Sequence, residues 1–456
     1  MTALALALVI PWAAGIVLAM LDGRRRLVGW LAVTALAANL AALVVLAALV
    51  LPDGRVEATT GNWPAGVGIT LRADALGVLF AVLSSLALLA ATVHEVLDGV
   101  RDRVFPGLVV LLAAGLTGVF VTGDVFDFYV FFELSMTAAY ILATYGGTRR
   151  ELGAALVFTA VNLLGTFVFL LSVAGLYHVT GTLNMSQAAV RVADVDPNAA
   201  ILIAVGFFAA FSVKLGLFPF HFWLPTVYTG ARPAVAAILS GGLANIGAYG
   251  LLRFGGELLP DELALAGTAL IVIGCASIVY GGMLAVSRRT SSEMLAYSAI
   301  GQVGYVLVAI GLGGPAGFAA AILYSVVNAL NKTLLFLTVE MRGAIVGAVF
   351  ALGALSVAGV PPAGGFVGKL ELFRAAIDSP AVLVLFFVGS ALSFVYVFQT
   401  YQFDFWRGER TGSLSGRPQQ AVVALVALVV MATGLWPEPL LALSHDAAEA
   451  LARAAG

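Results

Sequence analysis

The chain has 456 residues, of which 61% are hydrophobic and 11% charged, and its formal net charge is −2. A typical soluble domain carries roughly a quarter charged residues, so this composition excludes a soluble fold and predicts a membrane protein. The sequence has no basic cluster interleaved with aromatics and no glycine-rich phosphate loop, which argues against a nucleic-acid or nucleotide ligand. Its single cysteine, Cys275, allows neither an internal disulfide nor a cysteine-bound metal or iron–sulfur cofactor.

Apolar segments of about 20 residues recur along the whole chain, and each can cross a hydrocarbon core of about 30 Å as a helix. The first segment is followed, and not preceded, by basic residues, which favours a first span over a signal peptide. We therefore predict an all-α polytopic membrane protein with about 14 transmembrane helices. The predicted spans lie near residues 2–21, 27–51, 74–93, 105–122, 124–144, 152–177, 199–228, 233–254, 263–286, 293–312, 315–340, 344–377, 380–406 and 420–443.

The loops between these spans differ in their content of arginine. Loops after odd-numbered spans hold 14 arginines, whereas loops after even-numbered spans hold five. Cytoplasmic loops of membrane proteins carry the excess of positive charge. We therefore expect the odd-numbered loops on the cytoplasmic side and both termini on the outer side of the membrane.

Two of the predicted spans contain a proline- and glycine-rich interruption. Residues 211–225 read FSVKLGLFPFHFWLP and residues 355–370 read LSVAGVPPAGGFVGKL, so we expect helix breaks at Pro219 and at Pro361 and Pro362. The breaks lie five spans apart, which predicts two inverted five-helix repeats, a transporter plan in which broken helices line the ion pathway. Alternatively, these prolines only kink helices for packing. The repeats divide the chain into an N-terminal three-helix segment (1–104), a first repeat (105–254), a second, inverted repeat (263–406) and a C-terminal helix and tail (407–456).

Ionisable side chains deep inside the predicted spans are few. They include Glu133, Lys214, Lys332 and Lys369, and each costs at least about 2.5 kcal/mol at the bilayer centre. Glu133 and Lys214 could form a pair that separates when a proton or cation arrives, so that Lys214 passes its proton onward. Alternatively, they form a static ion pair that only orders their helices.

Polar side chains also follow one face of the span predicted at 315–340. Tyr324, Asn328 and Lys332 are spaced by four residues, which places them on the same side of a helix. The stripe is a candidate pathway, although such side chains can equally hydrogen-bond neighbouring helices. His221, just after the first break, either titrates near neutral pH or is a hydrogen-bonded structural histidine.

Several motifs resemble the antiporter-like subunits that are shared by complex I, membrane hydrogenases and Mrp-type multisubunit Na+/H+ antiporters. These motifs are GDVFDFYVFFELS at 123–135, GTLNM at 181–185, KLGLFPFHFWLP at 214–225, GAYGLLRF at 247–254, LAYSAIGQVGYVL at 295–307, NKTLLFL at 331–337 and GVPPAGGFVGKLELF at 359–373. The resemblance implies fourteen spans, two inverted repeats and a charged axis along the membrane midplane. Glu133, Lys214 and Lys332 match axis positions of the family.

Other positions of this axis depart from the family pattern. Asn245 stands where members usually have a lysine, and Tyr324 and Asn328 stand where histidines are frequent. Gln399 replaces a charged residue near the end of the thirteenth span. Amide and phenol side chains order water but do not store a proton, so we expect the connection between the two repeats to be neutralised.

The short chain and the GTLNM motif are similar to the D-type subunits of Mrp antiporters. The resemblance implies a multi-pass subunit of a hetero-oligomeric complex that exchanges Na+ or another monovalent cation for protons across a bacterial cytoplasmic membrane. Such a subunit is a secondary transporter component without a cofactor or a metal, and not an enzyme. Two alternatives stay open: a proton-pumping subunit of complex I or a membrane hydrogenase, and a non-conducting structural subunit with a degenerate channel.

Overall fold

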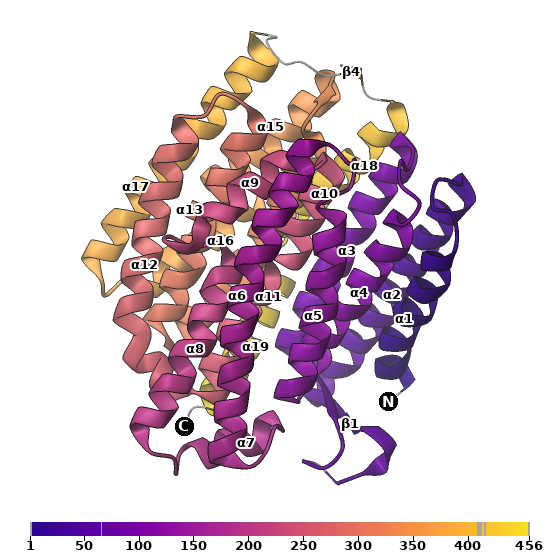
Figure 1. Ribbon diagram of the computed structural model, residues 1–456. Coiled ribbons are helices and arrows are strands. Elements are labelled where there is room, and N and C mark those ends of the chain that lie inside the picture. Colours follow the sequence, from indigo (N-terminus) through magenta and orange to yellow (C-terminus); the bar gives the residue numbers. More distant parts are fainter. Residues whose placement is uncertain (1, 65, 408–412, 415, 455–456) are drawn as a thin grey trace.

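Long helices run side by side through the molecule (Figure 1), because a backbone in hydrocarbon satisfies its N–H and C=O groups within a helix. The computed structural model describes residues 2–64, 66–407, 413–414 and 416–454, so residues 408–412 of the predicted C-terminal segment lie outside the described residues. Within the described residues, 12 helices are long and apolar enough to cross a bilayer, and two shorter apolar helices span 105–121 and 344–358. Together they confirm the prediction of fourteen spans.

The first three spans precede the repeats, and a small ribbon at the lower end of the bundle in Figure 1 joins the second span to the third. Strands β1 and β2 pair antiparallel, with Arg55 opposite Asp74. The Asp74 side chain accepts a hydrogen bond from the backbone N–H of Gly77 at 2.9 Å and so caps the third span. The elements are α1 (Thr2–Met20), α2 (Arg26–Asp53), β1 (Arg55–Thr59), η1 (Thr60–Asn62), β2 (Thr70–Asp74) and α3 (Ala75–Asp98).

The first repeat contains four continuous spans and one interrupted span. The interrupted span is α8, a short non-helical segment with one 3-10 turn, and α9, as the proline pattern predicts. The span after it changes twice into π-helical geometry, a form that is uncommon within helices. The elements are α4 (Phe105–Val121), α5 (Val125–Leu142), α6 (Arg149–Thr180), α7 (Met185–Val192), α8 (Pro197–Leu215), η2 (Phe220–Phe222), α9 (Trp223–Gly230), α10 (Pro233–Ala237), η3 (Ile238–Leu243), α11 (Asn245–Gly250) and η4 (Leu251–Leu258).

The second repeat has the same order of continuous and interrupted spans. Its first two helices approach closely through glycines: a Cβ atom on Gly281 would lie 2.4 Å from the backbone nitrogen of Gly301. This contact fixes the position of α13 against α12, and α13 carries part of the candidate site described below. The elements are α12 (Pro260–Val286), α13 (Ser291–Leu312), α14 (Gly314–Thr338), β3 (Met341–Arg342), α15 (Ala344–Ala358), α16 (Gly364–Ala375), α17 (Pro380–Tyr401) and η5 (Gln402–Trp406).

The C-terminal segment differs from the predicted helix and tail. The helix expected over 420–443 ends at Leu435, and a separate helix forms the predicted tail. One face of this last helix is buried, and it consists of Ser444, Ala447, Ala448 and Leu451. The helix contacts α14, α3 and η4. Its packing explains why the tail is ordered. The elements are β4 (Ser413–Leu414), α18 (Arg417–Leu435) and α19 (Glu438–Ala454).

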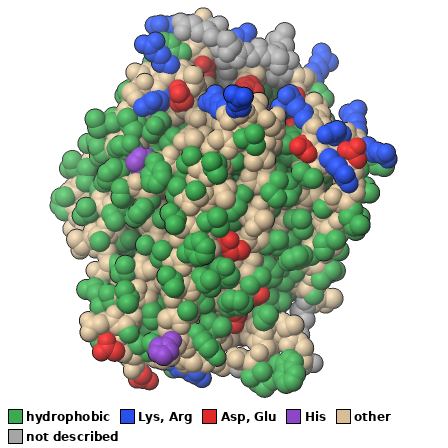
Figure 2. All heavy atoms as spheres, viewed as in Figure 1, with side chains coloured by type: hydrophobic (Ala, Val, Ile, Leu, Met, Phe, Trp, Pro, Cys, Tyr) green, Lys and Arg blue, Asp and Glu red, His purple; other side chains and the backbone are tan. Residues whose placement is uncertain are grey.

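Charged and apolar side chains are separated on the surface. Figure 2 shows hydrophobic side chains around the middle of the molecule and most of the visible arginine and lysine side chains at the upper end, near β4 in Figure 1. The chain ends marked N and C both lie at the opposite end (Figure 1). An apolar belt between two polar ends is the surface that a membrane-spanning bundle requires.

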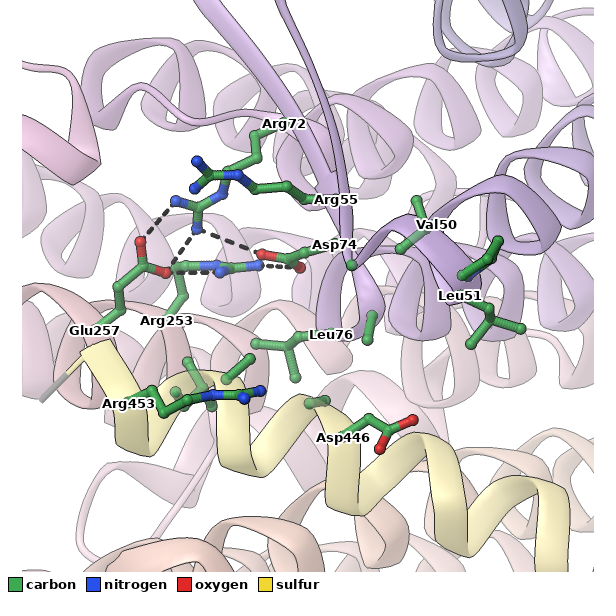
Figure 3. A pocket seen from close by; sticks show the side chains of 16 residues that line it. Val50, Leu51, Arg55, Arg72, Asp74, Leu76, Arg253, Glu257, Asp446 and Arg453 are labelled. Atoms are coloured by element: carbon green, nitrogen blue, oxygen red, sulfur yellow. Dashed lines mark hydrogen bonds and ion pairs between the residues drawn. The ribbon is translucent and has the colours of Figure 1, made fainter.

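Two arginines and two acidic residues form a cluster of ion pairs (Figure 3), next to the β1–β2 ribbon at the lower end of the bundle in Figure 1. Arg72 on β2 holds Glu257 on η4 through two bonds of 2.6 Å, and Arg253 contacts Glu257 at 2.7 Å. Arg253 also lies 2.6 Å from Asp74, and Arg72 lies 3.4 Å from it. Burial alone would raise the pKa of Asp74, but the guanidiniums of Arg253 and Arg72 outweigh it and hold that pKa well below its usual value. The cluster therefore ties the ribbon to the last turn of the eighth span.

Replacing Asp74 with asparagine should lower the free energy of unfolding by about 3 kcal/mol, because the two buried guanidiniums of Arg72 and Arg253 then share the single carboxylate of Glu257. Since the pKa is lower in the folded state, this stabilisation is present above the unfolded value of about 3.9. It is lost as the pH falls further, through the folded value. Thermal unfolding of the purified protein between about pH 7 and pH 3 should therefore show a difference from wild type that narrows only below about pH 4.

The matched control is Glu57→Gln on the same ribbon. Glu57 pairs with Arg55 at 3.8 Å, but the Arg55 side chain is 64% exposed. Removing such an exposed pair changes stability by about 1 kcal/mol or less. Equal losses in the two variants would contradict the structural role of the Asp74 cluster.

Candidate functional site

A glutamate and a lysine from different helices meet at one hydroxyl group in the first repeat. Thr166 on α6 donates a hydrogen bond from Oγ1 to Oε1 of Glu133 on α5 at 2.7 Å. The Nζ atom of Lys214 on α8 lies 3.2 Å from the same hydroxyl oxygen and 3.3 Å from the carbonyl oxygen of Asn162. The acid and the base that could form a pair are thus joined through a hydroxyl, which can both donate and accept.

The two charged ends of this bridge differ in their exposure. Lys214 is 6% exposed, and its Nζ atom lies 4.3 Å from the centre of the Phe132 ring, a cation–π contact. Glu133 is only partly buried. The carboxylate therefore faces the surroundings of the chain, while the ammonium group lies inside the protein.

Lys214 is held at the end of a broken helix. α8 stops one residue after it, because Gly216 adopts a left-handed conformation with φ of +67°. The Gly216 N–H donates to the carbonyl of Val213 at 3.1 Å, and the indole Nε1 of Trp223 in α9 donates to the same carbonyl at 2.9 Å. Both donors satisfy a carbonyl that the break would otherwise leave unpaired inside the membrane.

The second break repeats this arrangement with the lysine on the other side. α15 ends at Ala358, and the next residue, Gly359, has a φ of +83° and donates its N–H to the carbonyl of Ser356 at 3.0 Å. Lys369 on α16 reaches back across the break, and its Nζ atom donates to the carbonyl of Ala358 at 3.0 Å. The lysine therefore precedes the first break and follows the second.

Lys332 on α14 is bound in the same way as Lys214. Its Nζ atom donates to the hydroxyl of Ser298 at 2.7 Å and to the carbonyl of Leu295 at 3.3 Å, both on α13. The residue is 1% exposed. In each repeat, one lysine thus donates to a carbonyl and to a hydroxyl of a single neighbouring helix.

A neutral hydrogen-bond network continues from this point. Gln302 lies one helical turn after Ser298, and Tyr324 on α14 donates to its Oε1 atom. The Nε2 atom of Gln302 donates to the hydroxyls of Tyr396 and Ser393 on α17 at 2.8 and 3.2 Å. Three helices of the second repeat are therefore linked around one buried amide.

All three lysines of the chain, Lys214, Lys332 and Lys369, are buried inside spans, whereas the other 20 of its 23 basic residues are arginines. A buried lysine can give up its proton, but arginine stays charged in proteins. Among its lysines and arginines, the chain therefore places the only side chains that can readily lose a proton at these three positions.

Asn245 forms a polar contact between the first repeat and the N-terminal helices. Its Nδ2 atom donates to the hydroxyl of Ser84 on α3 at 3.2 Å and to the carbonyl of Gly241 at 2.8 Å. A cavity of about 20 Å³ lies between Lys214 and this span and is also lined by Asn162 and Ala244. It has room for about one water molecule.

The remaining predicted residues lie apart from these two groups. His221 accepts or donates a hydrogen bond with the hydroxyl of Tyr280 at 2.8 Å, beside the break at Pro219. Asn328 and Gln399 are partly exposed, and neither joins the network around Gln302 through a direct hydrogen bond between described residues. Among the described residues, no three histidine, cysteine, aspartate or glutamate side chains converge as a metal site.

Thr166, Ser298, Gln302 and Tyr396 are the site residues that sequence reasoning missed. Serine, threonine and glutamine are common in membrane helices as bonds between neighbours, so their presence alone carried no signal. One pattern could have indicated Thr166: it follows the polar residue Asn162 by four residues, so the two share one face of the same predicted span.

Fourteen apolar spans, two inverted five-helix repeats and one broken helix in each repeat define a polytopic membrane protein of the inverted-repeat transporter class. Residues 122–394, more than half of the chain, match the family described as NADH:quinone oxidoreductase/Mrp antiporter, TM. The chain belongs to this family. The match confirms the predicted relationship.

Proteins similar to this chain cover between 70% and 99% of it. The D subunit of the Na(+)/H(+) antiporter of Alkalihalophilus pseudofirmus is 29% identical over 435 residues, which cover 89% of this chain and 88% of that protein. The D subunit of a probable K(+)/H(+) antiporter of Rhizobium meliloti is 33% identical over 368 residues, covering 70% and 68%. A chain in the structure of the Mrp complex from Dietzia sp. DQ12-45-1b has a TM-score of 0.90 at 26% identity, covering 99% and 97%. The predicted all-α fold with two inverted repeats is thereby confirmed.

Proposed function

We propose that this chain is the D-type component of a multisubunit antiporter that exchanges protons for Na+ or another monovalent cation. The family match, the two relatives named as antiporter D subunits and the likeness to a chain of an Mrp complex support this assignment. On this proposal the chain works inside a membrane hetero-oligomer in a bacterial cytoplasmic membrane, with the arginine-rich end inside and both termini outside.

The bridge from Glu133 through Thr166 to Lys214 is the observation that carries a conducting role. A proton or cation that neutralises Glu133 weakens the attraction acting on the Lys214 ammonium group. Lys214 then passes its proton inward, toward the cavity shared with Asn162 and the eighth span. A static ion pair would not require a hydroxyl between the two groups, since direct contact gives the stronger attraction.

The second repeat extends the proposed pathway along the membrane midplane. Lys332 and Lys369 are its titratable groups, and Asn245, Tyr324, Asn328 and Gln399 are its neutral positions, with His221 near the first break. Pro219, Pro361 and Pro362 mark the helix breaks at which it bends. We propose that the repeats comprise residues 105–254 and 263–406, between an N-terminal segment of residues 1–104 and a C-terminal segment of residues 407–456.

Replacing Lys214 with arginine should abolish proton-coupled cation exchange, because arginine keeps the charge but does not release its proton. Glu133→Gln should have the same effect, because the amide cannot change its charge. Exchange is measured with a pH-sensitive dye in everted membrane vesicles that carry the full antiporter assembly. The expected signal is that of vesicles without the assembly.

Matched controls for these variants come from exposed charges. Arg289→Lys changes a basic residue in a loop, and Asp261→Asn removes an acid at the exposed start of α12. Both should leave exchange unchanged. Normal exchange in Lys214→Arg, with the assembly intact, would sink the role of Lys214 as a proton carrier.

Thr166→Val tests the bridge itself, because valine keeps the shape of threonine and loses the hydroxyl. Hydrogen bonds to charged groups contribute about 1.5 kcal/mol or more, so exchange should fall at least about tenfold. Thr166→Ser keeps the hydroxyl and should retain most of the exchange in the same vesicle assay. Equal activity of the valine and serine variants would show that the hydroxyl takes no part.

A non-conducting structural subunit is the second candidate, and Asn245 favours it. Its amide is satisfied by Ser84 and by the Gly241 carbonyl and cannot carry a proton. On that alternative, Glu133→Gln leaves exchange by the assembly unchanged, and Asn245→Lys raises it. The conducting proposal expects loss in Glu133→Gln, so the two variants together separate the functions.

A proton-pumping subunit of a redox complex is the third candidate, because the family also includes NADH:quinone oxidoreductase components. Purification of the native assembly separates it from the antiporter. A quinone- or ferredoxin-linked enzyme would copurify with a pumping subunit, whereas an antiporter assembly should contain membrane subunits alone.

A further inference from the structure

An apolar cleft of about 390 Å³ lies between α2, α3, α14 and α18, and no residue of the site described above lines it. Its walls include Ala37, Ala90, Leu330 and Val426. The one polar side chain on its walls, Thr333, donates to the carbonyl of Ala329 at 2.9 Å and so offers no free hydroxyl proton. The cleft therefore suits hydrocarbon and no polar ligand.

The cleft occupies the half of the bundle nearest the arginine-rich end. α2 begins at Arg26, seven residues before the first wall residue, and α18 begins at Arg417, five residues before its first wall residue. α3 ends at Asp98, five residues after its last wall residue. At 1.5 Å per residue, these helix ends lie roughly 8 to 10 Å above the cleft. The headgroup layer of one leaflet is roughly 5 to 8 Å thick, so a headgroup near these helix ends places its acyl chain at the depth of the cleft.

The rim above the cleft is rich in exposed guanidinium groups. Arg26 and Arg417 are exposed at the starts of their helices, and the side chain of Arg101, just beyond α3, is 62% exposed. The carboxylate of Asp98 has partners of its own: Gln419 donates a hydrogen bond to it at 3.0 Å, and Arg232 lies 3.2 Å from it. Arg101 also lies 3.6 Å from Asp98. This single carboxylate offsets only part of the charge of Arg26, Arg101 and Arg417, so the rim keeps a net positive charge.

We propose that this cleft binds one acyl chain of an anionic glycerophospholipid from the leaflet at the arginine-rich end. Its phosphate group lies at the rim formed by Arg26, Arg101 and Arg417. A helix with its side chains is about 10–12 Å across, which is too wide for a cleft of about 390 Å³. A partner helix could therefore insert only individual side chains, whereas a single acyl chain fits along the cleft. The lipid bridges α2 to α18, two helices from opposite ends of the chain.

The test measures lipid retention and is independent of transport. The intact assembly is stripped of lipid and then exposed to phosphatidylglycerol or to phosphatidylcholine with the same acyl chains. Native mass spectrometry then counts the lipid that stays bound to this subunit. Phosphatidylglycerol should be retained, and the double variant Arg101→Gln, Arg417→Gln should weaken its retention by about fivefold for each arginine removed. Arg289→Gln, an exposed arginine in another loop, should have no effect.

A second set of variants fills the cleft without changing its charge. Ala90→Trp places a ring inside it, and Leu425→Trp narrows it from a wall position that is 64% exposed and therefore tolerant of replacement. Both should displace the bound phosphatidylglycerol. Equal retention of phosphatidylcholine would overturn the anionic headgroup. Retention that Leu425→Trp leaves unchanged, or side chains of a partner subunit seated in the cleft, would overturn the site.

Discussion

Hydrocarbon supplies no hydrogen-bond partner, so each lysine ammonium group inside this bundle must find oxygen atoms within the protein. All three lysines do so with backbone carbonyls: Lys214 with Asn162, Lys332 with Leu295 and Lys369 with Ala358. The Ala358 carbonyl is available because the helix break frees it from the helical pattern. The second break therefore binds a lysine as well as interrupting its span, whereas the other two lysines bind carbonyls of the continuous helices α6 and α13.

A cation that is bound by carbonyls and hydroxyls differs from one that is paired with carboxylates. The cluster of Arg72, Asp74, Arg253 and Glu257 pairs every charge directly and so fixes its protonation state at ordinary pH. Carbonyls and hydroxyls donate no counter-charge, so they hold an ammonium group by hydrogen bonds alone. The fold thus separates a cluster of directly paired charges from three buried lysines that are held by neutral acceptors. On the proposed function, the lysines titrate during a cycle and the paired cluster does not.

The features that could be predicted from sequence are those that cost free energy in a membrane. Burying Lys214 or Lys332 is expensive, and a Gly–Pro break within an apolar span is rare, so both stand out along one chain. Thr166 and Gln302 do not stand out, because their role depends on which helix lies beside them. The same dependence explains why Asn328, although it shares a helix face with Tyr324 and Lys332, lies outside their network. The ordered tail was missed because α19 owes its order to contacts with α14 and η4.

The two repeats bind a lysine in the same way but differ in what lies next to it. Thr166 joins Lys214 to a carboxylate, whereas Ser298 lies one turn from Gln302, an amide that leads only to phenols and hydroxyls. Phenols release protons near a pKa of about 10, so this second network holds position and stores no charge. On the proposed function, charge changes in the second repeat are therefore confined to its lysines. Coupling between the repeats must then act through the electric field of these lysines and through water, since Asn245 carries no charge between them.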